Sequence, residues 1–371
     1  MKMKTGKRIF SAVLFAFAAL LSAVEPGGTL KHEDLTSAAA KVLSARSTEK
    51  MEPQYDVILF FDVLAPDAVN ALRMMDGIPD IFPAQKIRVS AFARNSEGTV
   101  AEALGRFHTE LLNVYADDAK GSLFNAFMRG EVVIPIAVIV QDEKIRWKGA
   151  PTDAESVLGR MISGSFSLQK QVRINMLRND LQGAVQAGLP EVILRSADEI
   201  LKIDPADTLA IQAKLYVLEG RKREDLAKAF LAEQVKKAPD NVTLRLFLLD
   251  LMVNTGDRDG FRNALTAALN EMKADVFSVT RLLGFSLNNA PLGWVPLADA
   301  NAAAAGLSAG MTELSPRVQA YRLEITARLA YFSMRIDDAV RMQESAAKIY
   351  PAGNAGIMLD YYRSVKALNG K

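Results

Sequence analysis

The apolar pattern of this chain changes near residue 168, and the change limits the folds open to it. Before residue 168, short apolar runs of strand length alternate with segments of helical spacing. After it, helical segments follow one another with short turns between them. Strands that alternate with helices predict an α/β sheet, whereas successive helices predict an all-α unit. We therefore expect an α/β domain over 54–168, with a central mixed sheet flanked by helices, and an α-helical domain over 169–371.

The α/β segment contains apolar runs that predict strands and helical segments between them. Strands are expected over 55–61, 86–94, 113–118, 132–140 and 143–149. Helices are expected over 66–78, 98–112, 120–130 and 152–164. Pro66 suits the first turn of a helix, and Thr152 has Glu155 three residues later, which is the spacing of a capping box. The tight turn at 141–143 predicts an antiparallel hairpin at one end of the sheet.

The first 23 residues have the pattern of a secretory signal peptide. A basic head precedes an apolar run over 9–21, and small residues follow it; the basic residues are Lys2, Lys4, Lys7 and Arg8. The run is shorter than the roughly 20 apolar residues that span a bilayer, which favours cleavage over retention as an anchor. We expect an exported protein, periplasmic or secreted, without stable membrane insertion after cleavage. A linker over 24–53 follows, with an amphipathic helix over 32–47.

The charge balance does not favour a nucleic-acid partner. The chain has 45 basic and 43 acidic side chains, and four of the basic ones lie in residues 1–23. Loss of this segment leaves 41 basic and 43 acidic residues, a net charge of −2. Nucleic-acid binding requires a concentrated basic face, which this composition does not indicate.

The residue types that carry most enzyme chemistry are sparse. The chain has no cysteine, which excludes disulfides, thiol catalysis and thiolate metal sites. His32, in a flexible start, and His108, on a predicted helix, lack a third partner for catalysis or metal binding. Asp117 and Asp118 are expected to lie in a solvated loop rather than at a metal. The chain has no phosphate-binding loop or Gly-x-Ser-x-Gly turn. We expect no enzyme activity, no cofactor and no metal.

Prolines recur at a regular interval in the helical segment. Pro205 and Pro239 lie 34 residues apart, and Pro316 and Pro351 lie 35 apart. Such a period is typical of tetratricopeptide-like helix pairs. A small and a large apolar residue, Ala227 and Leu231, precede Pro239 at the expected offsets, whereas Leu215 stands where glycine is preferred. A tetratricopeptide-like array is favoured, and an irregular helical domain is the alternative. The segment 284–310 is rich in turn residues and contains an alanine-rich helix.

The segment 132–164 resembles the second half of exported thioredoxin-like (redoxin-type) proteins. The matching residues are an Ile-Pro pair, an apolar strand, a polar turn, a Trp-x-Gly strand end, a proline and a helix that ends in glycine; they are Ile134, Pro135, 136–140, 141–143, Trp147, Gly149, Pro151 and Gly164. With the preceding strands, the resemblance covers about 115 residues over 54–168. It implies a sheet flanked by helices and a cis proline at Pro135; a trans proline at a strand start is the alternative.

The family's redox cysteines are replaced in this chain. The two matching positions are Ala65 and Ala68, and Leu64 stands at the preceding aromatic position. Alanine has no nucleophilic atom, so the family's disulfide chemistry does not carry over. The groove carries over, because the residue before the cis proline, here Ile134, pairs its backbone with an extended peptide. The implied binding residues are Leu64, Ala65, Pro66, Asp67, Ile134 and Pro135, with negative charge from Asp62 and Asp67.

These observations favour a redox-inactive scaffold. Its partners would be proteins or extended peptides, bound by the cis-proline groove and by the helical repeats. An accessory factor of a periplasmic thiol-disulfide or envelope protein-biogenesis pathway is the alternative. An enzyme with a polar pocket that the sequence does not reveal is a third possibility.

Overall fold

The computed structural model describes residues 24–39, 41–44, 51–105, 109–128, 134–308, 311, 314–351 and 355–369. The predicted signal peptide over 1–23 lies outside these ranges. The chain divides between Asn175 and Met176 into two compact units, and each has its own hydrophobic clusters. No helix in the described ranges has the length and apolar character needed to cross a membrane.

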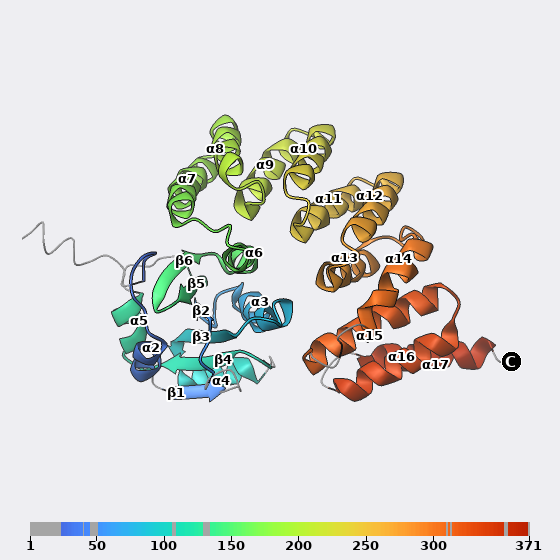
Figure 1. Ribbon diagram of the computed structural model, residues 1–371, viewed down its shortest axis with the longest axis horizontal. Coiled ribbons are helices and arrows are strands. Elements are labelled where there is room, and N and C mark those ends of the chain that lie inside the picture. Colours follow the sequence, from blue (N-terminus) through green and yellow to red (C-terminus); the bar gives the residue numbers. More distant parts are fainter. Residues whose placement is uncertain are drawn as a thin grey trace, which may run out of the picture. The chain divides into compact units, whose positions relative to one another are not determined.

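The N-terminal unit is built on a six-stranded mixed sheet (Figure 1). The strands are β1 Lys41–Ser44, β2 Tyr55–Phe61, β3 Ile87–Ser96, β4 Asn113–Asp117, β5 Ile136–Gln141 and β6 Lys144–Gly149. Their order across the sheet is β1-β4-β3-β2-β5-β6. The central strands β2, β3 and β4 are parallel, and β1, β5 and β6 pair antiparallel to their neighbours. All five strands predicted from the apolar runs are confirmed.

The sheet is covered on both faces. Its helices are α2 His32–Ala38, α3 Ala68–Ile81, α4 Glu97–Leu104, α5 Ser122–Phe127 and α6 Pro151–Ile162. Strand β2 shows why: Val57 and Leu59 pack into the cluster with α3 and α6, whereas Ile58 and Phe60 pack into the cluster with α2 and α5. A strand buried on both faces requires a continuous apolar run, as in 55–61.

The predicted helix over 32–47 is wrong in its second half. The helix ends at Ala38, and Lys41–Ser44 forms strand β1 instead. Val42 lies opposite Tyr115 in an antiparallel pairing with β4. The exposed edge of β4 offers unpaired backbone groups, and pairing with them prevails over the local helical pattern.

The predicted helix over 98–112 ends early, at Leu104. A buried carboxylate explains the extended segment that follows. Oδ1 of Asp76, on α3, accepts the backbone N–H groups of Glu110, Leu111 and Leu112 at 3.0, 2.8 and 2.9 Å. These bonds take the donors that a helix would have used.

Two predicted helix starts are also corrected. Helix α3 begins at Ala68, and Pro66 lies in the turn before it. Helix α6 begins at Pro151 after the N-cap Ala150, so Thr152 lies inside the helix and forms no capping box. Pro151 sits in the first turn, where its fixed φ angle and missing N–H cost nothing. Gly130, the predicted end of the helix over 120–130, lies outside the described residues.

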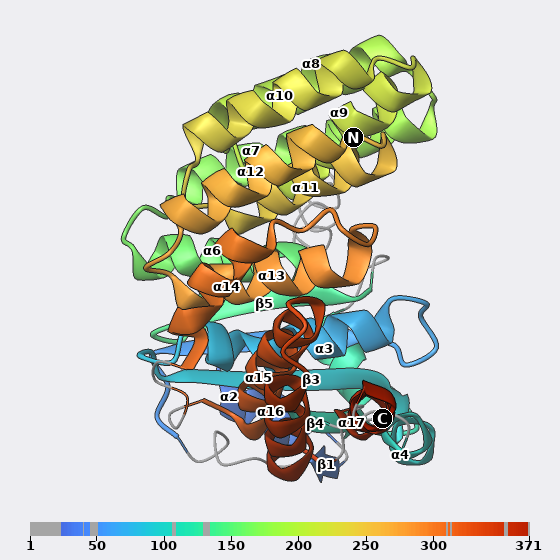
Figure 2. The same cartoon turned by 90° about the vertical axis from the view of Figure 1, so that its right-hand side faces the viewer.

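The C-terminal unit is helical throughout its described part. Its helices, with α7 spanning the division between the units, are α7 Leu168–Gln186, α8 Pro190–Ile203, α9 Thr208–Gly220, α10 Glu224–Lys237, α11 Val242–Asn254, α12 Arg258–Glu271, α13 Val276–Asn289, α14 Leu297–Ala304, η2 Ala305–Ser308, α15 Pro316–Phe332, α16 Ile336–Ile349 and α17 Ala355–Asn369. Successive helices pack against one another in chain order (Figure 1; Figure 2). The turn-rich stretch predicted over 284–310 is shorter, because α13 continues to Asn289.

Helix starts recur at a constant interval in the first part of this unit. Helices α9, α11 and α13 begin at Thr208, Val242 and Val276, 34 residues apart. Helices α8, α10 and α12 follow the same interval. The residue before each of the first three helices accepts a backbone N–H from the first turn; these N-caps are Asp207, Asn241 and Asp275. Beyond α13 the intervals become longer, because the turn at 290–296 adds residues.

Candidate functional site

The candidate site lies at the edge of the sheet where the parallel strands end. Strand β2 pairs antiparallel with β5, and Phe60 lies opposite Ile136. The turn that follows β2 and the segment that precedes β5 therefore emerge at the same edge. Strands β3 and β4, parallel to β2, also end there. Crevices at the carboxyl ends of parallel strands are where α/β sheets bind ligands.

The peptide bond between Ile134 and Pro135 is cis, as predicted. Both residues are half-buried. The Ile134 side chain packs against the clusters on both faces of the sheet, which fixes it at the end of the core.

The turn after β2 is held by a polar network. Oδ1 of Asp62 accepts the N–H of Leu64 at 2.9 Å and an Nδ2–H of Asn95 at 2.9 Å. Oδ1 of Asn95 accepts the N–H of Val63 at 2.8 Å, and the N–H of Ala65 donates to the carbonyl oxygen of Asp62 at 3.0 Å. The Asp62 carboxylate is therefore engaged in shaping the turn rather than directed at a ligand.

The residues predicted to line the groove differ in exposure. The side chain of Leu64 is 77% exposed, and Pro66 and Asp67 are also exposed. Asp67 is the N-cap of α3, but its side chain makes no capping hydrogen bond. Ala65 packs at the margin of the core, and Ala68 is buried within it. The turn thus presents an apolar tip and one acid, without a nucleophile at the two alanine positions.

A pocket opens beside Ile134, and the sequence did not predict it. Its volume is about 580 Å³, and it lies between the end of β3 and the loop from β4 to α5. Arg94 and Lys120 bring two exposed cations to its lining. The residues around it are Arg94, Ser96, Asp118, Ala119, Lys120, Gly121, Phe124, Asn125, Met128 and Ile134. Basic residues after two strands that end at one edge were the available signal.

The pair of aspartates before α5 is structural. Asp117 is buried, which corrects its predicted place in a solvated loop, and its carboxylate accepts the N–H groups of Leu123 at 2.9 Å and Phe124 at 3.0 Å. Asp118 accepts the hydroxyl and the backbone N–H of Ser122, and these bonds lower the pKa of Asp118. Both carboxylates thus cap α5. Within the described ranges, His, Asp and Glu side chains gather nowhere in groups of three that would hold a metal.

His32 lies in the core rather than in a flexible start, which corrects the prediction. Its ring packs edge-on against Phe92 and Tyr115, with centroids 6.2 and 6.0 Å apart. Burial lowers the pKa of His32 to about 4; Arg88 lowers it further and Asp56 raises it. The imidazole is therefore neutral near pH 7 and acts as a packing group. His108 lies outside the described residues.

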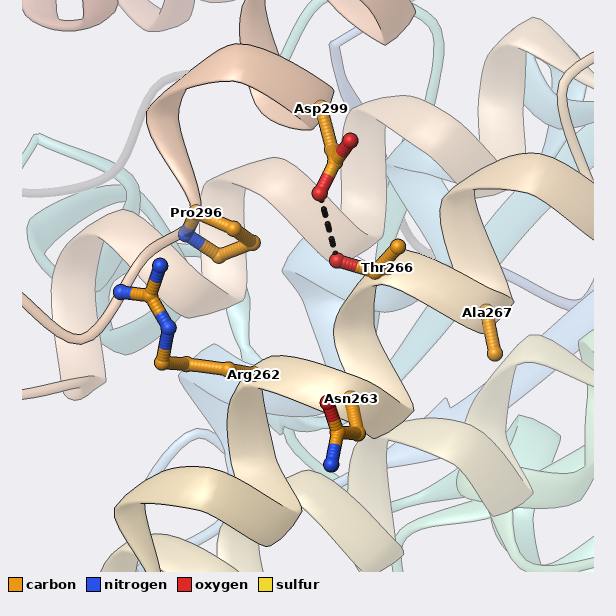
Figure 3. Close-up of a pocket in the computed structure, with 6 residues that line it drawn as sticks. All are labelled: Arg262, Asn263, Thr266, Ala267, Pro296 and Asp299. Atoms are coloured by element: carbon orange, nitrogen blue, oxygen red, sulfur yellow. Dashed lines mark hydrogen bonds between the residues drawn. The ribbon is translucent and has the colours of Figure 1, made fainter.

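A second hollow, of about 450 Å³, lies between α12 and α14 in the C-terminal unit (Figure 3). Its polar groups already have partners. The Thr266 hydroxyl donates to Asp299 Oδ2 at 2.7 Å, and Arg262 donates to the carbonyl oxygens of Gly293 and Trp294 at 3.3 and 3.4 Å. These bonds join the two helices, so the hollow is explained by helix packing.

No protein-family model matches the chain, and no curated protein matches it. Among solved structures, it is similar to the proposed thiol:disulfide interchange protein DsbE of Chlorobium tepidum, with 14% identity and a TM-score of 0.27. That similarity covers 34% of this chain and 96% of the other. The mixed sheet with helices on both faces and the cis proline at the strand-end edge resemble a thioredoxin-like fold, followed here by an all-helical part.

Proposed function

We propose that this chain is a redox-inactive scaffold that binds extended protein segments at the sheet edge beside Ile134. The observation that carries the proposal is the cis Ile134-Pro135 bond at this edge, in a chain that has no cysteine. A segment that pairs with the Ile134 backbone would add a strand there. Leu64, Pro66 and Asp67 would contact its side chains.

The pocket beside Ile134 supports a preference among such segments. Arg94 and Lys120 are exposed cations in its lining. An acidic side chain of the bound segment would be attracted to them, which increases the rate of association and favours one register of binding.

The helical part is proposed as a tetratricopeptide-like array that supplies a second protein-binding surface. The 34-residue interval of helix starts supports this proposal. The buried Ala227 and Leu231 of α10 also support it, because small and large apolar residues allow paired helices to pack closely.

We further propose export to the periplasm or the extracellular space, on the basis of the basic and apolar pattern of residues 1–23. A role as accessory factor in a periplasmic thiol-disulfide or envelope protein-biogenesis pathway is the second candidate. The resemblance to redox-active relatives favours it, because a domain without cysteines could still dock the same clients.

Photo-crosslinking tests the sheet-edge proposal. A benzophenone amino acid replaces Leu64, or, as the matched control, the 84% exposed Leu292 of the other unit. Each purified variant is irradiated with envelope extract. We expect one or a few protein adducts at position 64 that are absent at position 292. Reversing the charge at Arg94 and Lys120 should weaken these adducts. Identical adducts at both positions would contradict binding at this edge.

A further inference from the structure

A third pocket, of about 320 Å³, lies in the C-terminal unit between α13, α15, α16 and α17. Tyr321, Glu324 and Arg328 line it from α15, at helical positions three and four residues apart. This spacing places the three side chains on one face of the helix. Tyr362 of α17 closes the pocket from the other side, and Leu287 and Met358 give it an apolar wall.

The Glu324 carboxylate is half-buried and has no donor. Among the described residues, none forms a hydrogen bond or an ion pair with it. The nearby guanidinium of Arg328 donates instead to Oδ1 of Asn288, on α13. Burial raises the pKa of Glu324, and Arg328 opposes this only in part. A carboxylate that is partly removed from water and unpaired gains most from a cationic ligand.

Two tyrosine hydroxyls border the same space. The Tyr321 hydroxyl packs against Gly284 of α13, where a Cβ atom would lie within 2.0 Å of the oxygen. Glycine at this position therefore makes room for the hydroxyl. The Tyr362 ring is buried and stacks on Tyr331, and burial raises the pKa of Tyr362 to about 12. Both hydroxyls remain neutral at physiological pH, and each has an oxygen that accepts hydrogen bonds.

We propose that this pocket binds a primary ammonium group, supplied by a lysine side chain of a partner protein. An ammonium has three N–H donors, which match the Glu324 carboxylate and the hydroxyl oxygens of Tyr321 and Tyr362. The tyrosine rings add cation–π attraction, and the apolar wall receives the methylene stem. The proposal deepens the scaffold function and rests on the assignment of protein binding to the helices. It does not depend on the sheet edge beside Ile134.

An NMR titration of the full-length, ¹⁵N-labelled chain tests the pocket. The probes are acetyl-Ala-Ala-Lys-Ala-Ala-amide and the same peptide with norleucine in place of lysine. We expect the lysine peptide alone to shift the amide signals of Gly284, Glu324 and Met358. Glu324→Gln, which keeps the side-chain shape, should weaken binding about tenfold, the usual scale for a charge-assisted hydrogen bond. Glu219→Gln, an exposed change on α9, should leave binding unchanged.

Other outcomes separate the sources of the ligand and the two proposals. Tighter binding of the lysine peptide than of n-butylammonium supports a protein segment, whereas equal binding overturns the protein partner. Equal binding of the norleucine peptide, or unchanged binding by Glu324→Gln, overturns the pocket. A peptide with glutamate in place of lysine tests the sheet edge through the Ile134 signal. A shift there without one at Glu324 overturns the pocket alone, and the reverse pattern contradicts only the sheet-edge proposal.

Discussion

At the scale of single residues, the positions that matter most are Ala65 and Ala68. They lie in one turn, with the N–H of Ala68 donating to the carbonyl oxygen of Ala65 at 3.1 Å. Residues that close such a turn have Cα atoms less than about 7 Å apart, a separation that a disulfide spans with little adjustment. The backbone of this turn is therefore compatible with a dithiol motif, although the thiols are absent.

We therefore expect the double variant Ala65→Cys, Ala68→Cys to form an internal disulfide under mild oxidation. Intact-mass spectrometry would report the loss of two hydrogens, and the single variants serve as controls. A folded double variant that stays reduced under these conditions would show that the turn does not match the Cys-x-x-Cys position.

His32 should make stability depend on pH. Burial lowers the pKa of its folded state to about 4, from an ordinary value of 6.5. As the pH falls from 6.5 towards 4, the unfolded state binds the proton and the folded state does not, so the free energy of unfolding decreases over this window. Above pH 6.5 the contribution is complete. The charged groups that act on the imidazole are Arg88 and Asp56.

Urea unfolding at pH 7.5 and pH 4.5 measures this effect. His32→Gln should lose less stability between the two pH values than the parent chain. The carboxylates titrate in both proteins, so the difference between the two chains isolates His32. An equal loss in both would mean that the imidazole is not shielded from solvent in the folded state.

At the scale of elements, Asp76 joins α3 to the segment that enters β4. Replacement by alanine leaves three backbone N–H groups without this acceptor. Hydrogen bonds to charged groups contribute about 1.5–3 kcal/mol each, so Asp76→Ala should cost about 3 kcal/mol or more in the free energy of unfolding. Denaturant unfolding followed by circular dichroism measures this cost. Asp67→Ala, on the same helix but exposed, should change the value by less than about 0.5 kcal/mol. Similar costs for both variants would contradict the role of Asp76.

The elements predicted correctly are those determined by their own residues. The apolar run at 55–61 can be buried on both faces only as a central strand, and it forms β2. The errors came from contacts between distant segments. Strand β1 forms because β4 offers an edge, and the helix after Glu97 ends because Asp76, more than 30 residues away, binds the following segment. The pocket beside Ile134 was missed for the same reason, since segments far apart in sequence meet there.

At the scale of the whole molecule, the absence of cysteine distinguishes the fold from its chemistry. The sheet, the flanking helices and the cis proline form without a thiol, because apolar burial on both faces stabilises them. The same burial explains why an exported chain of this size would need no disulfides: its large hydrophobic clusters replace the cross-links on which small secreted domains depend.

The purified chain should not accelerate the reduction of insulin disulfides by dithiothreitol. Disulfide exchange requires a thiolate nucleophile, and alanine occupies both matching positions. Turbidity of the precipitating insulin B chain measures the rate, with the Ala65→Cys, Ala68→Cys variant as the matched comparison. That variant should exceed the parent chain if the cis proline and the turn still support exchange. Turnover by the parent, in material free of contaminating thioredoxin, would mean that another group attacks disulfides, and the redox-inactive scaffold would have to be abandoned.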